Sequence, residues 1–312
     1  MRQTCLDQIY ELAKTDPRIV FIGSDLGVGT LRKFKEEMPE RFFMEGVSEA
    51  HIVGMAAGMA LEGAIVYVNT ISTFITRRCF EQVAVDLCLH NLNVRLIGNG
   101  GGLVYAPLGP THLAIEDISI FRALPNMTVV AVADAEEMKR LMPQTVDHRG
   151  PIYIRLAKGG DPVVSSDKVP FRIGKALSMR DGRDALLVTT GVTLKVALDA
   201  AEILARSGIE ASVLHMPTVK PLDEAAFLEH AARAMVILAI EENTIIGGLG
   251  SALAELVSEA GLNPARKFKR IGVPDRFPDK YGSQANLLDY YGINAQHVVA
   301  VVKSLAGRKQ AA

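Results

Sequence analysis

An acidic side chain at the start of a small-residue segment is the first candidate for chemistry. Glu49 begins the stretch EAHIVGMAAGMAL, in which glycine and alanine recur from Gly54 to Ala60. A carboxylate in the first turn of a helix is favoured by the helix dipole alone. The small residues, however, would let another backbone or chain approach closely and exclude water from the carboxyl group. We therefore expect Glu49 to be desolvated and able to donate or share a proton.

Two other groups of residues are candidates for binding. The segment STFITRRCFEQ places Phe74, Arg77 and Phe80 close together, which fits either ordinary core packing or a flat apolar slot with a cationic rim. His112 lies in GPTH, a rigid turn after the glycine-rich run 98–102. It is either a capping group or a ligand at the carboxyl end of a strand, where α/β proteins bind small molecules.

The elements that must position these residues alternate between short apolar runs and amphipathic segments. In the first half we expect strands at 18–22, 64–69, 94–97, 128–132 and 152–156, with helices at 49–61, 75–89 and 135–142. Continuous apolar strands separated by helices predict a parallel sheet that is covered on both faces.

The same alternation returns after a segment rich in Gly, Pro and Ser at 158–178. Strands are expected at 185–189, 211–215 and 235–241, and helices at 194–205, 223–231, 251–260 and 296–305. The predicted fold class is therefore α/β, with two tandem domains that each contain a mostly parallel sheet covered by helices. We place these domains at residues 1–165 and 180–312.

Composition excludes several classes of protein. The 312 residues carry 34 Lys and Arg against 35 Asp and Glu, so no positive field attracts nucleic acid or anionic lipid. The three cysteines form no CxxC pair, which argues against a zinc site and indicates a reducing compartment. No apolar run approaches the roughly 20 residues that span a membrane. We expect a cytoplasmic protein with no membrane segment and no metal ligands of its own.

Several motifs in order carry a family resemblance. GVSEAH, STFITRRCFEQ, GPTH and IYIRLAKG resemble the pyrimidine-binding domain of thiamine diphosphate enzymes, above all transketolase and 1-deoxy-D-xylulose-5-phosphate synthase. MPTVKPLDE and AIEENTIIGGLGSALAE resemble the C-terminal domain of the same enzymes. The GDG motif that binds the diphosphate and a divalent metal in this family is absent, and the chain begins where the second domain of a full-length member would begin.

The resemblance therefore implies the C-terminal subunit of a split, thiamine diphosphate-dependent transketolase. Such a subunit would transfer a two-carbon ketol unit between sugar phosphates or their analogues. It would be inactive without an N-terminal, diphosphate-binding subunit, and the two subunits would form an α2β2 heterotetramer. The magnesium or calcium ion would be held mainly by residues of that N-terminal subunit.

The resemblance also implies residue roles at the cofactor. Glu49 matches the carboxyl group that bonds N1′ of the aminopyrimidine, and Phe74 and Phe80 match aromatic positions around that ring. Asp25, in GSDLG, matches an acidic residue near the thiazolium and is otherwise an ordinary turn residue. Arg77 replaces an aromatic residue of transketolases and resembles the synthase.

Substrate contacts follow in the same way. His112 matches a catalytic histidine that donates a proton or a hydrogen bond to a substrate oxygen, and Arg155 matches an arginine that holds the substrate phosphate. His51, two residues after Glu49, matches the spacing of the synthase and is a further candidate for substrate binding.

Three positions depart from the family pattern. Leu108 stands where most members have an aspartate that contacts a sugar hydroxyl. Gly100 and Gly101 stand where transketolases and the synthase have a histidine and an arginine, respectively. Losing a buried polar partner changes discrimination for the group it contacted. These departures point to an unusual ketose donor, modified at the end that normally carries phosphate.

Two alternatives remain open at this stage. The first is another thiamine enzyme: a decarboxylating carboligase like the synthase, or the β subunit of a 2-oxoacid dehydrogenase. The second is a non-catalytic subunit that regulates a partner, against which the presence of Glu49 argues.

Overall fold

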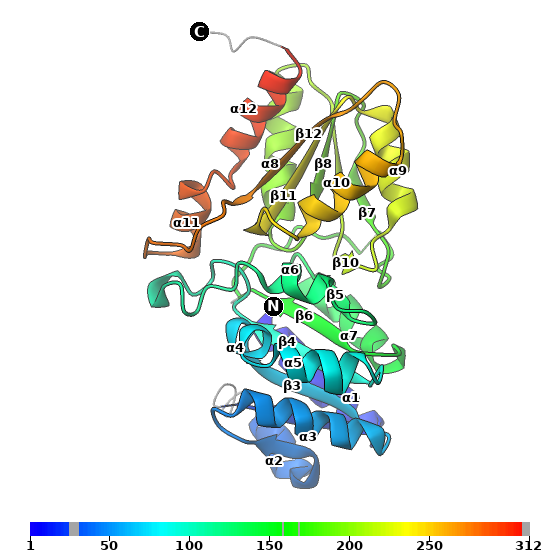
Figure 1. The fold of residues 1–312 in the computed structure, drawn as a ribbon, viewed down its shortest axis with the longest axis vertical. Coiled ribbons are helices and arrows are strands. Elements are labelled where there is room, and N and C mark those ends of the chain that lie inside the picture. The colour runs from blue at the N-terminus through cyan, green and yellow to red at the C-terminus, as the bar shows by residue number, and fades with distance from the viewer. Residues whose placement is uncertain (25–30, 158, 168, 308–312) are drawn as a thin grey trace.

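Two β-sheets, each with helices on its faces, follow one another along the chain (Figure 1). The structure is a computed structural model, and it describes residues 1–24, 31–157, 159–167 and 169–307. The α/β class with mostly parallel sheets, predicted from the alternation of apolar runs, is confirmed.

The first sheet has the strand order β10-β5-β6-β4-β3-β1-β2. Its strands are β1 (Ile19–Gly23), β2 (Phe42–Met44), β3 (Ile65–Ile71), β4 (Val94–Asn99), β5 (Thr128–Ala131), β6 (Ile152–Leu156) and β10 (Thr218–Lys220). All neighbours are parallel except β10, which pairs with β5 in the antiparallel direction. The carboxyl ends of the parallel strands therefore meet along one edge, where ligands bind in such sheets.

The second sheet has the order β12-β11-β8-β9-β7. Its strands are β7 (Leu177–Arg180), β8 (Ala185–Thr189), β9 (Ala211–His215), β11 (Val236–Thr244) and β12 (Lys267–Val273). Only β7, which pairs with β9, is antiparallel. β8, β9 and β11 are buried along their whole length, because helices cover both faces of the sheet.

Helices join the strands. The first half contains α1 (Arg2–Thr15), α2 (Arg32–Glu37), α3 (Glu49–Leu61), α4 (Ser72–Arg77), α5 (Phe80–Gln82), α6 (Asp117–Arg122) and α7 (Ala135–Asp147), with short η segments at Pro39–Arg41, Val83–Cys88 and Ala106–Leu108. The second half contains α8 (Thr193–Arg206), α9 (Glu224–Arg233), α10 (Leu249–Glu259), α11 (Gln284–Tyr290) and α12 (Ala295–Leu305). The helix expected at 75–89 is broken into α4, α5 and the π-helical segment Val83–Cys88.

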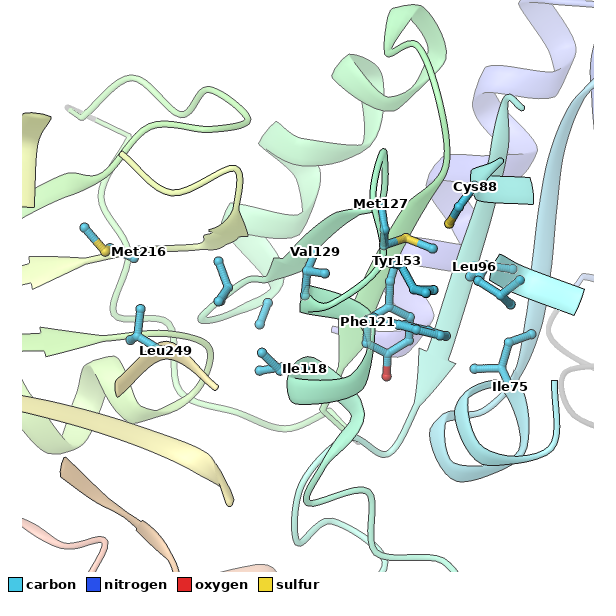
Figure 2. Close-up of a cluster of buried hydrophobic side chains, with 14 of the residues drawn as sticks. Ile75, Cys88, Leu96, Ile118, Phe121, Met127, Val129, Tyr153, Met216 and Leu249 are labelled. Atoms are coloured by element: carbon cyan, nitrogen blue, oxygen red, sulfur yellow. The ribbon is translucent and has the colours of Figure 1, made fainter. Parts of the chain in front are cut away.

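The hydrophobic core is continuous from the first sheet to the second. Figure 2 shows Met216 and Leu249, from the second half, in the same cluster as Ile118 and Val129 from the first. The edge strand β10 adds to this continuity because it comes from the second half of the chain and completes the first sheet. Neither feature could be expected from the local pattern of apolar residues.

A buried arginine that is ion-paired with Asp117 also joins the two halves through a hydrogen bond. Nε of Arg155 donates to a carboxylate oxygen of Asp117 at 2.9 Å, and its Nη2 donates to the backbone oxygen of Glu242 at 2.7 Å. The Glu242 side chain in turn accepts from the backbone N–H of Leu103 at 2.9 Å. Burial raises the pKa of both Asp117 and Glu242, which makes the neighbouring Arg155 cation important for their ionised forms.

The Arg155→Met substitution is expected to lower the free energy of unfolding by about 3–5 kcal/mol, because it leaves buried carboxyl groups without their cation. Urea unfolding measures this loss. Lys195→Met, which breaks the exposed pair with Asp199 on α8, is the control and is expected to cost about 0–1 kcal/mol. Equal losses for the two variants would contradict a special role for the buried pair.

A second buried carboxylate holds the start of α10. Glu241 accepts hydrogen bonds from the backbone N–H groups of Leu249 and Gly250, both at 2.8 Å. A Cβ at Gly248 would collide with this carboxylate, so glycine is required at this position of the run GGLG for a steric reason. Burial raises the pKa of Glu241 to about 7, although the two N–H donors act in the opposite direction.

The contribution of Glu241 to the free energy of unfolding is therefore expected to fall as the pH rises from about 4.5 to about 7. Over this range Glu241 keeps its proton in the folded chain but loses it in the unfolded chain. Glu241→Gln has no such proton, so its loss of stability over this range should be smaller by on the order of 3 kcal/mol. Urea unfolding at pH 5 and pH 8 measures the difference. The exposed control Glu202→Gln should keep the wild-type dependence, and a parallel pH profile for Glu241→Gln would contradict the assignment.

Candidate functional site

The Glu49 carboxyl group is buried at the first residue of α3, beside the carboxyl end of β3. Its side chain is 1% exposed. Thr70, in β3, donates its hydroxyl to Oε1 at 3.3 Å, and Arg78 donates Nη1 to Oε2 at 2.6 Å. Glu49 is thus desolvated, and each of its oxygens has a donor from the chain itself. The expected close neighbour at the small residues is not what buries it, because Gly54 and Gly58 are exposed and nothing lies within 4 Å of the position that a Cβ would take at either.

Arg78 connects Glu49 to an aromatic ring. The guanidinium carbon lies 4.4 Å from the centroid of the Phe74 ring, within cation–π distance. α4 ends at Arg77, so Arg78 lies in the break before α5 and can turn toward α3. The Arg78 guanidinium consequently lies between the buried carboxylate and the Phe74 ring. The Arg78 side chain is 46% exposed.

His112 is adjacent to the same ring. The His112 and Phe74 ring centroids are 5.3 Å apart in an edge-on arrangement. The Thr111 hydroxyl lies 2.9 Å from Nδ1 of His112, and this contact fixes one side of the imidazole. The structure therefore brings together Glu49, Phe74 and His112, three residues that are widely spaced in the sequence.

Arg77 was predicted to bind the cofactor, but its side chain contacts the loop that carries His112. Its guanidinium donates to the backbone oxygens of Pro110 and Leu113, at 3.1 Å and 2.9 Å, and pairs with the Glu116 carboxylate. All these partners belong to the loop that carries His112. Arg77 therefore positions this loop against α4, and the slot beside Glu49 holds the next residue, Arg78.

Other predicted residues lie outside this cluster. Phe80 is 39% exposed, and no aromatic partner is found for its ring in the described part of the chain. His51 is exposed because a helix turns about 200° over two residues, so it points away from the side that holds Glu49. Asp25 lies outside the described residues.

Arg155, predicted to hold a substrate phosphate, is 6% exposed and is engaged in the buried pair with Asp117. Its Nη2 also donates to the backbone oxygen of Ala114 at 3.1 Å. In the structure this guanidinium joins the two halves of the chain, because three acceptors satisfy it away from solvent. A phosphate role for Arg155 would require these contacts to open.

Tyr105 is a site residue that the sequence did not indicate. Its ring lies 6.5 Å from the His112 ring, edge-on, and it packs over Gly100. Gly100 has a φ of +71°, and a Cβ there would collide with the Tyr105 ring. A side chain at position 100 would therefore have to displace the Tyr105 ring. The only feature of the sequence that pointed to this position was the pair Gly100 and Gly101, which leaves room for a neighbouring ring.

A residue from the second half of the chain contacts the GPTH turn. The Tyr281 ring, which is 67% exposed, lies against Gly109 of the GPTH turn. Leu108, the residue before that turn, is 51% exposed. This apolar side chain, four residues before His112, is thus part of the surface.

Comparison with known proteins now defines the family. Residues 1–160 match the model of the transketolase pyrimidine-binding domain, and residues 174–298 match that of the transketolase C-terminal domain. The chain belongs to the transketolase family. The resemblance that rested on a few motifs is confirmed over most of the sequence.

Relatives within the transketolase family include proteins of similar length. The chain is 37% identical to the 6-deoxy-6-sulfo-D-fructose transketolase subunit SqwH of Clostridium sp. (strain MSTE9), covering 99% of this chain and 95% of the relative. A solved structure described as a split gene transketolase, an inactive β4 tetramer, superimposes with a TM-score of 0.89 and 34% identity, covering 99% of both chains.

A longer relative is also similar. The chain is 38% identical to 1-deoxy-D-xylulose-5-phosphate synthase 1 of Geobacter sulfurreducens over 98% of its length. It spans only 48% of that synthase, about half of the longer enzyme. The similarity therefore concerns the part of the synthase that corresponds to this chain.

The transketolase pyrimidine-binding domain takes its name from the ring of thiamine diphosphate, and the residues present fit such a ring. An aminopyrimidine needs a hydrogen-bonding carboxyl group and a flat apolar surface, which Glu49 and Phe74 supply side by side. Within the described residues, no three His, Cys, Asp or Glu side chains are grouped as a metal site. In that part of the chain, no helix is long and apolar enough to cross a membrane.

Arg77→Ala is expected to loosen the His112 loop, because the arginine's contacts with Pro110, Leu113 and Glu116 disappear. Amide hydrogen exchange is the measurement: the N–H groups of His112 and Leu113, which bond the oxygen of Gly109, should exchange about tenfold faster. Arg206→Ala, an exposed arginine on α8, is the control and should leave these two amides unchanged. Unchanged exchange in Arg77→Ala would show that the loop is held by other contacts.

Proposed function

We propose that this chain is the C-terminal subunit of a split transketolase that transfers a two-carbon ketol unit between sugar phosphates or their analogues. The observation that carries the proposal is the buried Glu49 carboxyl group beside Phe74 and His112, in a chain that matches both family domains. The similarity in length to a named transketolase subunit and to a split gene transketolase supports the subunit assignment.

A partner subunit is part of the proposal. The 312 residues contain no GDG motif for a diphosphate and its metal. Glu49 and Phe74 provide for the pyrimidine end only, so an N-terminal subunit would hold the diphosphate and the magnesium or calcium ion. Exposed apolar side chains at both ends of α3, Val47 at 67% and Leu61 at 65%, and the bare surfaces of Gly54 and Gly58 suit a close contact with another chain. An α2β2 assembly would place two such contacts about a twofold axis.

The residues of this chain have distinct roles in the proposed reaction. Thiamine diphosphate, when bound, supplies the nucleophilic carbon that accepts the two-carbon unit. Glu49 bonds the ring nitrogen of the pyrimidine and shares a proton with it, and burial keeps water from competing for that bond. Phe74 supports the flat face of the ring. His112 donates a hydrogen bond to a substrate oxygen, and the loop held by Arg77 sets its direction.

The substrate end is proposed to be unusual. Tyr105 covers the glycine at the position of the transketolase histidine, and Leu108 replaces an aspartate that contacts a sugar hydroxyl. A site with an aromatic ring and an apolar side chain at these positions favours a ketose whose far end differs from that of an ordinary sugar phosphate. The SqwH relative supports this specificity, because the 6-deoxy-6-sulfo sugar in its name is a ketose of this kind.

The Glu49→Gln substitution is expected to lower transfer activity of the reconstituted two-subunit enzyme by about 10²–10⁴-fold, because the amide cannot exchange a proton with the ring nitrogen. The assay follows ketol transfer from a panel of ketose donors, including 6-sulfo and 6-phospho sugars, to an aldose phosphate. Glu202→Gln, an exposed change on α8, is the matched control and should retain full activity.

Three results would overturn the proposal. Undiminished activity of Glu49→Gln would indicate a regulatory subunit. Release of carbon dioxide from pyruvate without ketol transfer would indicate a decarboxylating carboligase like the synthase. Oxidative decarboxylation would indicate the β subunit of a 2-oxoacid dehydrogenase.

A further inference from the structure

Arg78 makes contacts that resemble those of a bound ring. Its Nη1 donates to the buried Glu49 carboxylate at 2.6 Å, and its planar guanidinium lies 4.4 Å from the Phe74 centroid. An aminopyrimidine would use the same two features, a nitrogen-bonding carboxyl group and an aromatic face. The Arg78 guanidinium and an aminopyrimidine therefore cannot both bond this oxygen of Glu49 and lie on this face of Phe74 at the same time.

The neighbouring arginine shows how loosely Arg78 is held. Arg77 has three partners in the His112 loop, whereas the only hydrogen bond found for Arg78 within the described residues is the one to Glu49. The Arg78 side chain is 46% exposed, while that of Glu49 is 1% exposed. Arg78 can therefore rotate into solvent when another donor takes its place at Glu49, and it gives up only that hydrogen bond and its contact with the Phe74 ring.

We infer that Arg78 is a placeholder for the cofactor ring, which pairs with Glu49 and covers Phe74 until the ring of thiamine diphosphate displaces it. This inference rests on the proposed function. The physical reason for a placeholder is the cost of an unpaired carboxylate that is buried. Arg78 supplies a cation and a planar face to a site that must remain folded before the partner subunit delivers the cofactor.

Displacement makes Arg78 a competitor of the cofactor. Binding must break a charge-assisted hydrogen bond and a cation–π contact before the ring can form its own. Removing the arginine therefore should tighten binding. A residue that instead gripped the cofactor or substrate would show the reverse effect, so affinity distinguishes the two roles.

The first test is calorimetric titration of thiamine diphosphate, with magnesium chloride present, into the reconstituted two-subunit complex. Arg78→Ala is expected to lower the dissociation constant by about 5–30-fold, because no pair has to be broken. Arg206→Ala, an exposed arginine of α8, is the matched control and should bind as the wild type does. An unchanged or weaker affinity in Arg78→Ala would overturn the inference.

The second test uses the chain alone and needs no cofactor. Arg78→Ala should lower the thermal midpoint when Glu49 is present, because a buried carboxylate loses its cation. The same change in a Glu49→Gln background should have a much smaller effect, since no charge remains to be paired. Equal shifts in the two backgrounds would also overturn the inference.

These tests separate the inference from the proposed function. If the wild-type complex binds no thiamine diphosphate, the proposed function fails, and the thermal cycle still decides whether Arg78 pairs with Glu49. If the wild-type complex binds the cofactor but Arg78→Ala binds no more tightly, only the placeholder fails.

Discussion

The site depends on a carboxyl group that is removed from water at the start of α3. Glu49 is 1% exposed, so each of its oxygens requires a donor from the protein or from a ligand. Thr70 provides one from the end of β3, and Arg78 provides the other from the break after α4. Phe74 and His112 lie next to this pair, because Arg78 lies on the Phe74 ring and His112 lies at that ring's edge.

The surrounding fold holds these elements at one edge of a sheet. β3 and β4 are parallel neighbours, and the segments that follow them carry Phe74 and the glycine-rich run before His112. The second half of the chain fixes this edge further, through the Arg155 network and the contact of Tyr281 with Gly109. A core shared by both halves means that the two sheets support the site as one packed unit (Figure 2).

Part of this arrangement could be predicted from local patterns. The apolar segment at 49–61 is helical between the residues expected, and the buried strand at 152–156 has the predicted bounds. β2, β7, β10 and β12 were missed. β2 and β10 are only three residues long, β7 pairs antiparallel at the edge of its sheet, and β12 alternates exposed and partly buried residues over much of its length. Their pairing depends on partners distant in the sequence, which a local pattern does not contain.

The order of motifs and the alternation of strands and helices determined the family and the fold class. These properties depend on residue type and local periodicity, which the sequence carries directly. Only the tertiary structure decided which arginine faces Glu49. Arg77 and Arg78 are adjacent and chemically identical, but α4 ends between them, so one side chain anchors the His112 loop and the other turns to the carboxylate. The tertiary structure likewise decided that Arg155 is buried between the two halves. The acceptors of its guanidinium come from segments far apart in the chain.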